Sequence, residues 1–385
     1  MTAASPGPAT GSALAVRAGA LPAVLPAGAV LHLRPAGLVR GAAARGLLAA
    51  GGARLLAGGP LAFTLVEVLV RAPDAVTSAM LPVAATEAWA ESLATPYRER
   101  MEALLARAVA PRAPLVPAAH GRPLVMGVVN VTPDSFSDGG DFHHAADAVA
   151  QGRALAAAGA DILDVGGEST RPGALPVAPA EEQARVLPVI RALSETGVPI
   201  SIDTRNADTM RAALAAGADI VNDVSALTHD SAAAAVVAGA RVPVVLMHAQ
   251  GDPRTMQQNP AYACAPLDVA EALEARIAAC EAAGIPRARI AVDPGIGFGK
   301  TVAHNLEILA RLGVLHGLGC PILLGVSRKS FVARLSAGEP PKGREPGSLA
   351  AALAGVAQGV QVIRVHDVAG TVQALKVATA VAQAE

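Results

Sequence analysis

The segment VVNVTPDSFSDGG (residues 128–140) joins a strongly apolar start to a long polar tail. Its valines suit a buried β-strand, whereas the proline, glycines, serines and aspartates that follow favour turns. The strand therefore ends by presenting the amide side chain of Asn130 beside a long polar loop. This arrangement recurs along the chain, and its repetition predicts the fold.

Eight short apolar runs follow one another in the C-terminal two thirds of the chain. They occupy residues 124–132, 160–167, 198–204, 218–225, 242–249, 289–295, 321–329 and 360–367. Alanine-rich helical segments separate them, and several of these segments end in AAGA or AAGI, where glycine suits the end of a helix. Apolar strands that alternate with helices predict a parallel sheet covered on its outer face.

The number of these units favours a closed barrel. Eight strand–helix units over residues 121–385 match a (β/α)8 TIM barrel, which usually takes about 250 residues. A doubly wound open sheet is the alternative, but no run of edge-type strands supports it. We therefore expect an α/β protein whose catalytic domain, residues 121–385, is a TIM barrel.

The first 115 residues do not continue the pattern of alternating strands and helices. Residues 1–30 look like a flexible leader, VLHLRP (30–35) and AFTLVEVLVR (62–71) predict strands, and residues 85–109 predict one long amphipathic helix. The proline-rich segment 110–123 predicts a linker. We expect residues 1–115 to form an N-terminal α/β extension that packs on the outside or bottom of the barrel and takes no part in the chemistry.

Composition excludes several classes of protein. The net charge is −1 and only 16% of residues are charged, which does not favour a nucleic-acid-binding or membrane-surface protein. Proline and glycine interrupt each apolar run before it is long enough to span a membrane. Three cysteines (Cys264, Cys280 and Cys320) have no metal-like spacing, and an odd number argues against a disulfide framework. The sequence predicts a cytoplasmic protein.

Polar side chains stand at or just after the C-terminal ends of the predicted strands. They are Asn130, Glu168 with Thr170 and Arg171, Asp203, Asn222, His248, Asp293, Lys329, and Arg364 with His366. An aspartate or asparagine there has about even odds of only capping the next helix, but capping does not account for arginine, lysine and histidine. In a TIM barrel these strand ends converge on one face, where the active site lies.

The chemistry of these residues indicates an anionic ligand with an amidine-like end. VDPGIGFGK (292–300) fails as a phosphate-binding loop because Pro294 stands where glycine is required. Asp293 can accept two parallel hydrogen bonds from a 2-aminopyrimidinone. The basic residues of GVSRKSF (325–331) and Arg364 either offset the aspartates in a structural network or bind a phosphate or pyrophosphate. Asn130 and Asp203 offer oxygen ligands suited to Mg²⁺.

Seven motifs in order resemble the dihydropteroate synthase family of the folate pathway. They are MGVVNVTPDSFSDGG (126–140), DVGGESTRPGA (164–174), SIDT (201–204), NDVSAL (222–227), DPGIGFGK (293–300), GVSRKSF (325–331) and RVHDV (364–368). The resemblance implies condensation of 6-hydroxymethyl-7,8-dihydropterin pyrophosphate with 4-aminobenzoate, which gives 7,8-dihydropteroate and pyrophosphate. It also implies Mg²⁺ and a homodimer.

The resemblance assigns a role to each matching residue. It implies that Asp203, Asn222, Asp293 and Lys329 hold the pterin, with Met247 and Phe298 as apolar neighbours. It implies that Asn130, Arg171, Arg364 and His366 handle pyrophosphate and Mg²⁺, with Asn130 as the metal ligand. It implies that Thr170, Pro172, Phe298, Ser327 and Lys329 border the aminobenzoate. Asp203, Lys329 and Arg364 are the expected catalytic residues.

Two other functions remain open. One is a pterin-binding methyltransferase on the same barrel, and the other is a non-catalytic paralogue that binds pterin as an interaction module. The complete TRPG, SRK and RVH motifs disfavour both. We also expect the loops TPDSFSDGGDFHH (132–144) and STRPGALPVAP (169–179) to close over the ligands, because they are long, polar and rich in glycine and proline.

Overall fold

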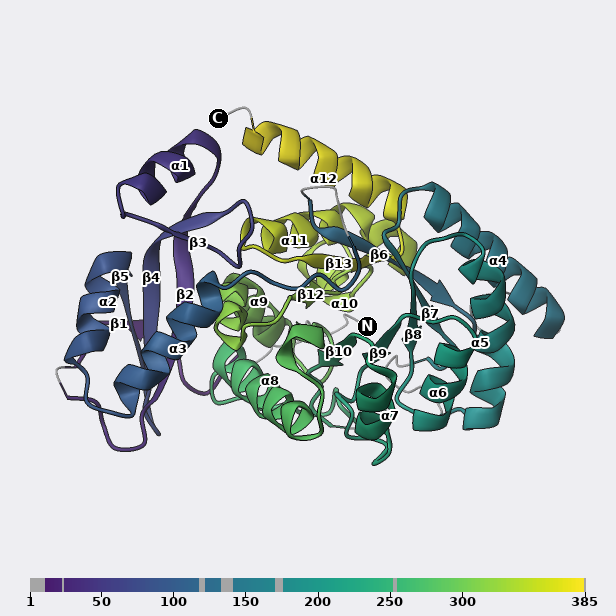
Figure 1. Cartoon of the computed structure of the whole chain (residues 1–385), viewed down its shortest axis with the longest axis horizontal. Helices are drawn as coiled ribbons and strands as arrows, with labels where there is room; N and C mark the ends of the chain where they lie inside the picture. The colour runs from purple at the N-terminus through teal and green to yellow at the C-terminus, as the bar shows by residue number, and fades with distance from the viewer. Residues whose placement is uncertain are drawn as a thin grey trace, which may run out of the picture.

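The chain folds into two sheets with helices around them, seen in a computed structural model. The structure describes residues 11–22, 24–117, 122–132, 141–169, 176–251 and 255–383. One sheet has five strands and belongs to the N-terminal third of the chain, and the other has eight strands and belongs to the rest. The two parts lie side by side in Figure 1, the first in purple and blue and the second in teal, green and yellow.

The eight-stranded sheet is the predicted barrel. Its strands are β6 (Leu124–Asn130), β7 (Ile162–Gly166), β8 (Ile200–Asp203), β9 (Ile220–Asp223), β10 (Val244–Met247), β11 (Ile290–Asp293), β12 (Leu323–Leu324) and β13 (Val362–Val365). The pairings between them are parallel, in the order β11-β10-β9-β8-β7-β6-β13-β12. A parallel bridge between Val292 and Ile322 joins the two ends. The closed barrel and its eight predicted strands are confirmed.

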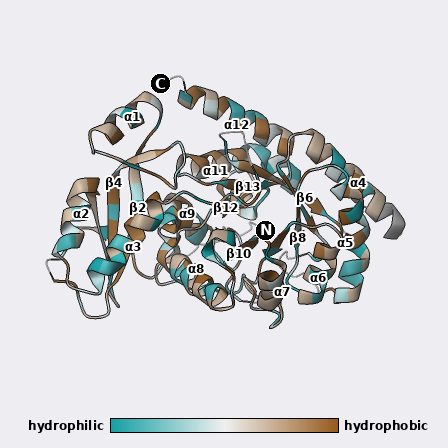
Figure 2. Cartoon of the chain, in the orientation of Figure 1, coloured by the Kyte–Doolittle hydropathy of each residue, from teal (hydrophilic) through white to brown (hydrophobic). Residues whose placement is uncertain are grey.

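Helices cover the outside of the barrel. They are α4 (Asp141–Ala157), α5 (Pro179–Ser194), α6 (Ala207–Ala215), α7 (Ala233–Ala240), α8 (Ala265–Ala282), α9 (Val302–Ala310), α10 (Ser330–Leu335), α11 (Glu345–Ala357) and α12 (Val368–Gln383). The 3-10 helices η2 (Arg287–Arg289), η3 (Leu312–Leu318) and η4 (Pro341–Arg344) complete the connections. Strands buried on both faces need continuous apolar runs, and Figure 2 shows barrel strands in brown with helices of mixed colour around them.

The N-terminal unit is a small α/β sheet structure. Its strands are β1 (Val16–Ala18), β2 (Val30–Val39), β3 (Arg54–Leu55), β4 (Ala62–Arg71) and β5 (Val76–Pro82), and its helices are α1 (Gly41–Ala49), α2 (Val83–Ser92) and α3 (Tyr97–Val109). β4 lies between β2 and β5 in antiparallel pairing, and β1 extends the sheet in parallel with β5. Leu33, Phe63 and Met101 are buried in a core of this unit's own.

Two expectations about the N-terminal third are wrong. Residues 12–18 are not a loose leader, because the Leu14 N–H donates to the Ala263 carbonyl at 2.7 Å and the next residues form β1. Ser12 also contacts the carboxylate of Glu307 on α9. The single helix expected over 85–109 is two helices, α2 and α3, with a break that ends at Pro96. Proline interrupts a helix because it has no N–H and its ring clashes with the preceding turn.

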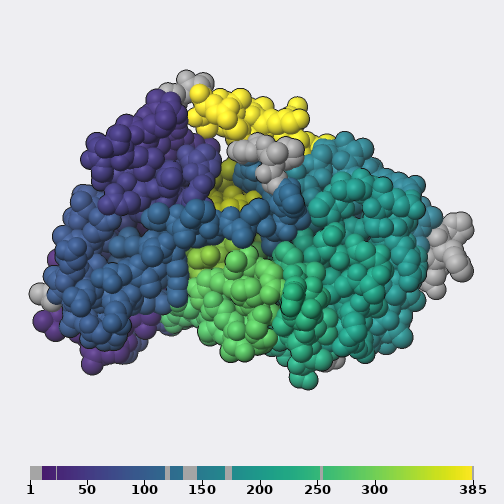
Figure 3. Space-filling model, viewed as in Figure 1, coloured from purple at the N-terminus to yellow at the C-terminus, as the bar shows by residue number. Residues whose placement is uncertain are grey.

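Ion pairs fasten the N-terminal unit to the outside of the barrel. Glu271 on α8 contacts His32 Nε2 at 2.9 Å and Arg71 Nη1 at 3.0 Å. One turn along α8, Glu274 contacts Arg100 Nη1 at 2.6 Å and Arg107 Nη1 at 2.8 Å. The two parts consequently share a continuous surface (Figure 3).

The segment after α3 is a structural part of the barrel and not a free linker. Leu115 and Val116 are buried and cluster with Leu124, Ile162 and other residues at the N-terminal ends of the barrel strands. In Figure 3 the blue segment that leaves the N-terminal unit crosses the face of the molecule above the green part of the barrel. These two side chains therefore close the floor of the barrel, opposite the predicted site. Among the described helices, none is long and apolar enough to cross a membrane.

Candidate functional site

The strand register brings the first polar side chains into a row. Asn130 is paired with Gly166 of β7, which is paired with Asp203 of β8, which in turn is paired with Asn222 of β9. Further round the barrel, Met247 of β10 is paired with Asp293 of β11. The row follows from parallel strands that end at one level, so residues 92 positions apart in sequence (222 − 130) become neighbours on one face.

Arg364 connects three strands across the mouth of the barrel. Its Nε donates to Asp164 Oδ2 at 2.6 Å and its Nη2 donates to Asp203 Oδ2 at 2.8 Å. Asn222 Nδ2 donates to the same Asp164 oxygen at 3.2 Å. A planar guanidinium suits this arrangement because its N–H groups point at two acceptors at once.

Burial and neighbouring charges have opposing effects on the pKa values of Asp203 and Arg364. Burial raises the pKa of Asp203 to about 7, and although Arg364 opposes the shift, the neighbouring Asp164 carboxylate adds to it. Burial alone would lower the pKa of Arg364, but Asp164 and Asp203 outweigh it and raise this pKa above its ordinary value. Arg364 therefore stays charged, while Asp203 changes its protonation in the neutral range.

Asp293 lies at the start of the glycine-rich loop and is buried. Its Oδ1 accepts from the Gly295 N–H at 2.7 Å. Burial raises the pKa of Asp293, while the Gly295 hydrogen bond and the Lys329 charge oppose that shift. Burial also lowers the pKa of Lys329 to about 8, and its Nζ lies 4.1 Å from the centre of the Phe298 ring.

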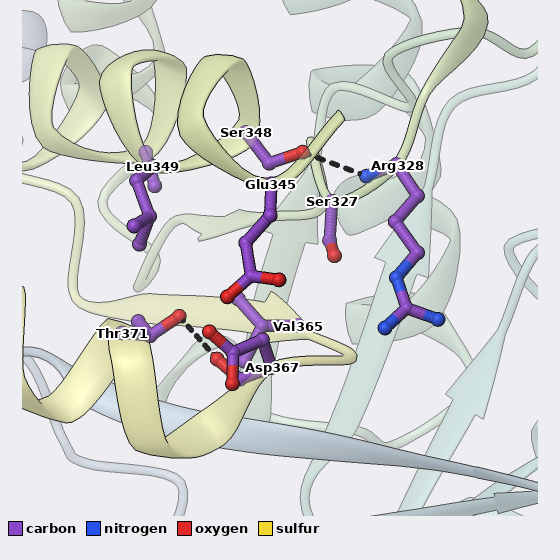
Figure 4. Close-up of a pocket in the computed structure, with 9 residues that line it drawn as sticks. Ser327, Arg328, Glu345, Ser348, Leu349, Val365, Asp367 and Thr371 are labelled. Atoms are coloured by element: carbon purple, nitrogen blue, oxygen red, sulfur yellow. Dashed lines mark hydrogen bonds between the residues drawn. The ribbon is translucent and has the colours of Figure 1, made fainter. Parts of the chain in front are cut away.

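Ser327 and His366 meet at the junction of the last two barrel strands. Ser327 Oγ lies 3.0 Å from His366 Nδ1, and the His366 N–H donates to the same Oγ at 3.2 Å. Behind them is a small crevice in which the carboxyl groups of Glu345 and Asp367 face each other (Figure 4). Their hydrogen bond raises the pKa of Glu345.

The structure gathers most of the predicted site residues at one end of the barrel. These are Asn130, Asp203, Asn222, Met247, Asp293, Phe298, Ser327, Lys329, Arg364 and His366. Thr170, Arg171 and Pro172 lie outside the described residues, as do most of the loops 132–144 and 169–179. Glu168 is bound at 2.8 Å by Arg205 Nη2, which gives it an ion-pair partner beside the site.

Two buried charged residues near the site have no clear signal in the sequence. Asp164 sits inside the apolar strand ILDVG, and a buried charge in such a strand needs a partner, here Arg364. Lys300 closes the glycine-rich loop and is almost fully buried. It was overlooked because a lysine at the end of a polar loop ordinarily faces solvent.

The donor set at the mouth is compatible with Mg²⁺. The described residues contain no group of three or more His, Cys, Asp or Glu side chains that could hold a metal ion. Asn130 offers an amide oxygen at the end of β6. Mg²⁺ commonly binds through one or two protein oxygens and completes its shell with phosphate oxygens and water. Asn130 thus fits a Mg²⁺ ion that arrives with a phosphate ligand.

Sequence comparison places the barrel among known proteins. The family model described as "Pterin binding enzyme" matches residues 126–366. Dihydropteroate synthase of Neisseria meningitidis serogroup C is 50% identical over 258 residues, which cover 66% of this chain and 91% of the relative. Dihydropteroate synthase of Escherichia coli K12 is 46% identical over 264 residues, 68% of this chain and 93% of the relative.

Solved structures agree with the sequence matches. Xanthomonas albilineans dihydropteroate synthase with 4-aminobenzoic acid is 50% identical, with a TM-score of 0.64, and the match covers 68% of this chain and 93% of that chain. The Yersinia pestis enzyme in complex with a sulfonamide drug is 43% identical, with a TM-score of 0.66, and the match covers 69% and 96% of the two chains. These matches leave about a third of this chain uncovered.

Proposed function

The chain belongs to the pterin binding enzyme family and acts as a dihydropteroate synthase, a transferase of folate biosynthesis, and from this premise we propose how its residues divide the reaction. The proposed substrates are 6-hydroxymethyl-7,8-dihydropterin pyrophosphate and 4-aminobenzoate. The observation that supports the proposal is the connected set Asp293, Lys329, Arg364 and Asp203, in which a carboxylate suited to a pterin lies next to positive charge suited to a pyrophosphate.

Asp293 binds the pterin ring in this proposal. A carboxylate has four acceptor sites, so Asp293 can keep its bond from the Gly295 N–H and still accept the paired N–H groups of the 2-aminopyrimidinone. Asn222 and Asp203 add hydrogen-bonding groups from the neighbouring strands, and Met247 adds an apolar contact. Because the carboxylate is buried, its hydrogen bonds to the ring are stronger than they would be in water.

The pyrophosphate is bound by Arg364 and His366, with Arg171 from the loop after β7. Its hydrogen bonds to Asp164 and Asp203 hold the Arg364 guanidinium in a fixed position. Mg²⁺ held by Asn130 and the pyrophosphate oxygens would supply positive charge that stabilises the leaving group. Preorganised charge of this kind lowers the barrier because it does not need to reorganise during the reaction.

Bond breaking precedes bond making in the proposed mechanism. The C–O bond between the pterin methylene and the pyrophosphate breaks, and its electron pair leaves with the pyrophosphate. The charged form of Asp203 stabilises the positive charge that develops on the methylene and ring. The amine lone pair of 4-aminobenzoate then forms the C–N bond, and the amine proton passes to solvent.

The aminobenzoate lies between the loop after β7 and the end of β12. Ser327 and Lys329 provide a hydroxyl and a charge, and the Phe298 ring provides an apolar wall. Thr170 and Pro172 border the same space in this proposal. Lys329 lies beside both Asp293 and Phe298, so it joins the two substrate sites.

The test is an assay of the purified full chain with both substrates and Mg²⁺. We expect pyrophosphate release that depends on 4-aminobenzoate and an equal amount of 7,8-dihydropteroate by chromatography. Pterin binding without product would indicate the non-catalytic paralogue. Methyl transfer from methyltetrahydrofolate without pyrophosphate release would indicate the methyltransferase. Either result would overturn the proposal.

We also propose a homodimer in a reducing cytoplasm. Val377 and Val381 of α12 are 59% and 67% exposed, which supports an apolar contact between copies on that helix. Cys264, Cys280 and Cys320 are all buried free thiols, which supports a reducing compartment. Light scattering of the full chain, compared with Val381→Lys, tests the dimer: equal masses for both proteins would count against this helix.

A further inference from the structure

Lys300 is a buried lysine for which the proposed reaction has no use. It closes the glycine-rich loop after β11 and is only 3% exposed. Among the described residues, no carboxylate lies within ion-pair distance of its Nζ. A buried ammonium is costly unless other groups replace its hydration, so this lysine needs an explanation.

The Lys300 ammonium is surrounded by acceptors from the backbone. Its Nζ donates to the carbonyls of Gly295 at 2.9 Å, Phe298 at 3.0 Å and His248 at 3.2 Å. His248 Nδ1 is a fourth neighbour, at 3.0 Å. Burial and the Lys300 charge lower the pKa of His248 to about 3, so the ring is neutral, and Nδ1 can accept in the tautomer that carries its proton on Nε2. Lys300 therefore joins the loop after β11 to the end of β10.

The glycines of the loop explain why so many carbonyls converge on one point. A Cβ on Gly295 would lie 1.9 Å from the His248 carbonyl oxygen, and a Cβ on Gly299 would lie 2.2 Å from that of Gln250. Both glycines also have positive φ. The two backbones are thus in direct contact, and their carbonyl dipoles are offset by the one ammonium group between them.

Two of the groups that Lys300 fixes belong to the substrate site. The Gly295 carbonyl accepts a hydrogen bond from Lys300, and the Gly295 N–H donates to Asp293 Oδ1. The Phe298 carbonyl also accepts a hydrogen bond from Lys300, and the Phe298 ring lies against Lys329. Movement of the loop would consequently disturb the Asp293 carboxylate and the Phe298 wall together.

We propose that Lys300 is a positioning residue for the pterin site, whose Nζ binds the Gly295, Phe298 and His248 carbonyls and so sets the Asp293 carboxylate and the Phe298 ring for the pterin. The inference rests on the proposed function of Asp293. It differs from a purely structural role because it predicts a loss of pterin affinity at temperatures where the protein is fully folded.

The test measures binding of 6-hydroxymethylpterin by calorimetry without 4-aminobenzoate. Lys300→Met keeps the length of the side chain but removes every donor. We expect its dissociation constant for the pterin to rise about 10- to 100-fold, because small errors in the position of binding groups are costly. Lys300→Gln keeps two donors, so it should recover part of this loss. It also serves as the test protein if Lys300→Met does not fold.

Two control variants separate positioning from stability. Val245→Ala removes volume from the barrel floor and should lower the melting temperature while leaving the pterin dissociation constant unchanged. Lys376→Met removes an exposed lysine of α12 and should change neither quantity. Wild-type affinity in folded Lys300→Met, or in Lys300→Gln where Lys300→Met does not fold, would overturn the inference. Failure of the wild-type protein to bind the pterin would instead overturn the proposed function.

Discussion

Asp293 is the residue on which the pterin assignment depends most directly. Asp293→Asn keeps the shape of the side chain but replaces an acceptor oxygen with a donor that faces the ring N–H groups. We expect kcat/KM to fall by the equivalent of about 2–4 kcal/mol, because charge-assisted hydrogen bonds are stronger than neutral ones. The measurement is steady-state kinetics with varied pterin pyrophosphate.

A second aspartate provides the matched control. Asp219 accepts from the Ile200 N–H at 2.9 Å at the opposite end of the barrel strands. Asp219→Asn should cost some stability and leave kcat/KM within about twofold, since it touches no proposed ligand. An Asp293→Asn enzyme that is as active as Asp219→Asn would show that Asp293 is only structural.

Arg364 makes a prediction about pH. Arg364→Met leaves Asp164 and Asp203 buried without their shared cation, which should cost about 3 kcal/mol of unfolding free energy. The folded pKa of Asp203 is raised above its ordinary value of 3.8, so its contribution to stability is fully present below 3.8 and is lost as the pH rises through about 7. Arg364 opposes this rise in pKa. Without Arg364 the folded pKa of Asp203 is raised further, so the variant continues to lose stability at pH values above about 7.

The loss of unfolding free energy in Arg364→Met, relative to wild type, should therefore be largest in alkaline solution. Urea unfolding at about pH 5 and about pH 8.5 measures it, and we expect the larger difference from wild type at the higher pH. Arg122→Met is a control because Arg122 pairs with Asp161 at the floor of the barrel, 2.6 Å away. A deficit that does not depend on pH would mean that lost packing, and not charge, dominates.

Residue roles were easier to predict at strand ends than inside strands. Asp203, Asn222 and Asp293 stand where an apolar run stops, and in a parallel barrel this position alone determines which face they reach. Asp164 and Lys300 act through partners brought by other strands. Their contacts depend on barrel closure and backbone packing, which no local pattern records.

The elements of the barrel were predictable and those of the N-terminal unit only partly so. Barrel strands are buried on both faces, so each is a distinct apolar run bounded by turn residues. β5 was not expected, because its exposed Met80 and polar Thr77 give no such run. The break before α3 was missed because residues on both sides of Pro96 have helical periodicity.

Helix α8 carries the charges that fasten the two units. Burial alone would raise the pKa of Glu274, but its contacts with Arg100 and Arg107 outweigh burial and lower it below the ordinary value of 4.5. A carboxylate with a lowered pKa stabilises the folded state above 4.5, and this stabilisation is lost as the pH falls through the folded pKa.

Glu274→Gln should therefore destabilise the protein more at neutral pH than in acid. We expect a loss of about 1–2 kcal/mol at neutral pH, reduced by the partial exposure of the group, and a loss that becomes smaller as the pH falls below 4.5. Chemical unfolding at the two pH values measures it, with exposed Glu195→Gln as the control. An equal loss in acid would exclude the charge as its cause.

At the scale of the molecule, the N-terminal unit and the barrel are more closely joined than a linker implies. We predict that residues 116–385, expressed alone, keep turnover within a few-fold of the full chain, because the proposed site residues all follow residue 123. We also predict a lower melting temperature, since the truncation uncovers α8 and η3 and removes Leu115 from the floor of the barrel.

A substitution in the full chain separates these two effects. Leu115→Ala should lower stability by about 2–4 kcal/mol with unchanged kcat/KM, because it opens a cavity at the end of the barrel opposite the site. A soluble, pterin-binding 116–385 protein with no turnover would show that the N-terminal unit helps to form the site.

The ion pairs of α8 also bear on the order in which the protein is made. His32 and Glu271 are 239 positions apart, so at about 5–20 residues per second the ribosome needs roughly 10–50 seconds between them. During that time the five-stranded sheet has emerged, but the surface it will press against the barrel has no partner. Arg71, Arg100 and Arg107 lie on this surface, where their partners on α8 are still missing. The arginines that join the two parts of the finished protein therefore also give this surface charged groups during the interval before α8 is made.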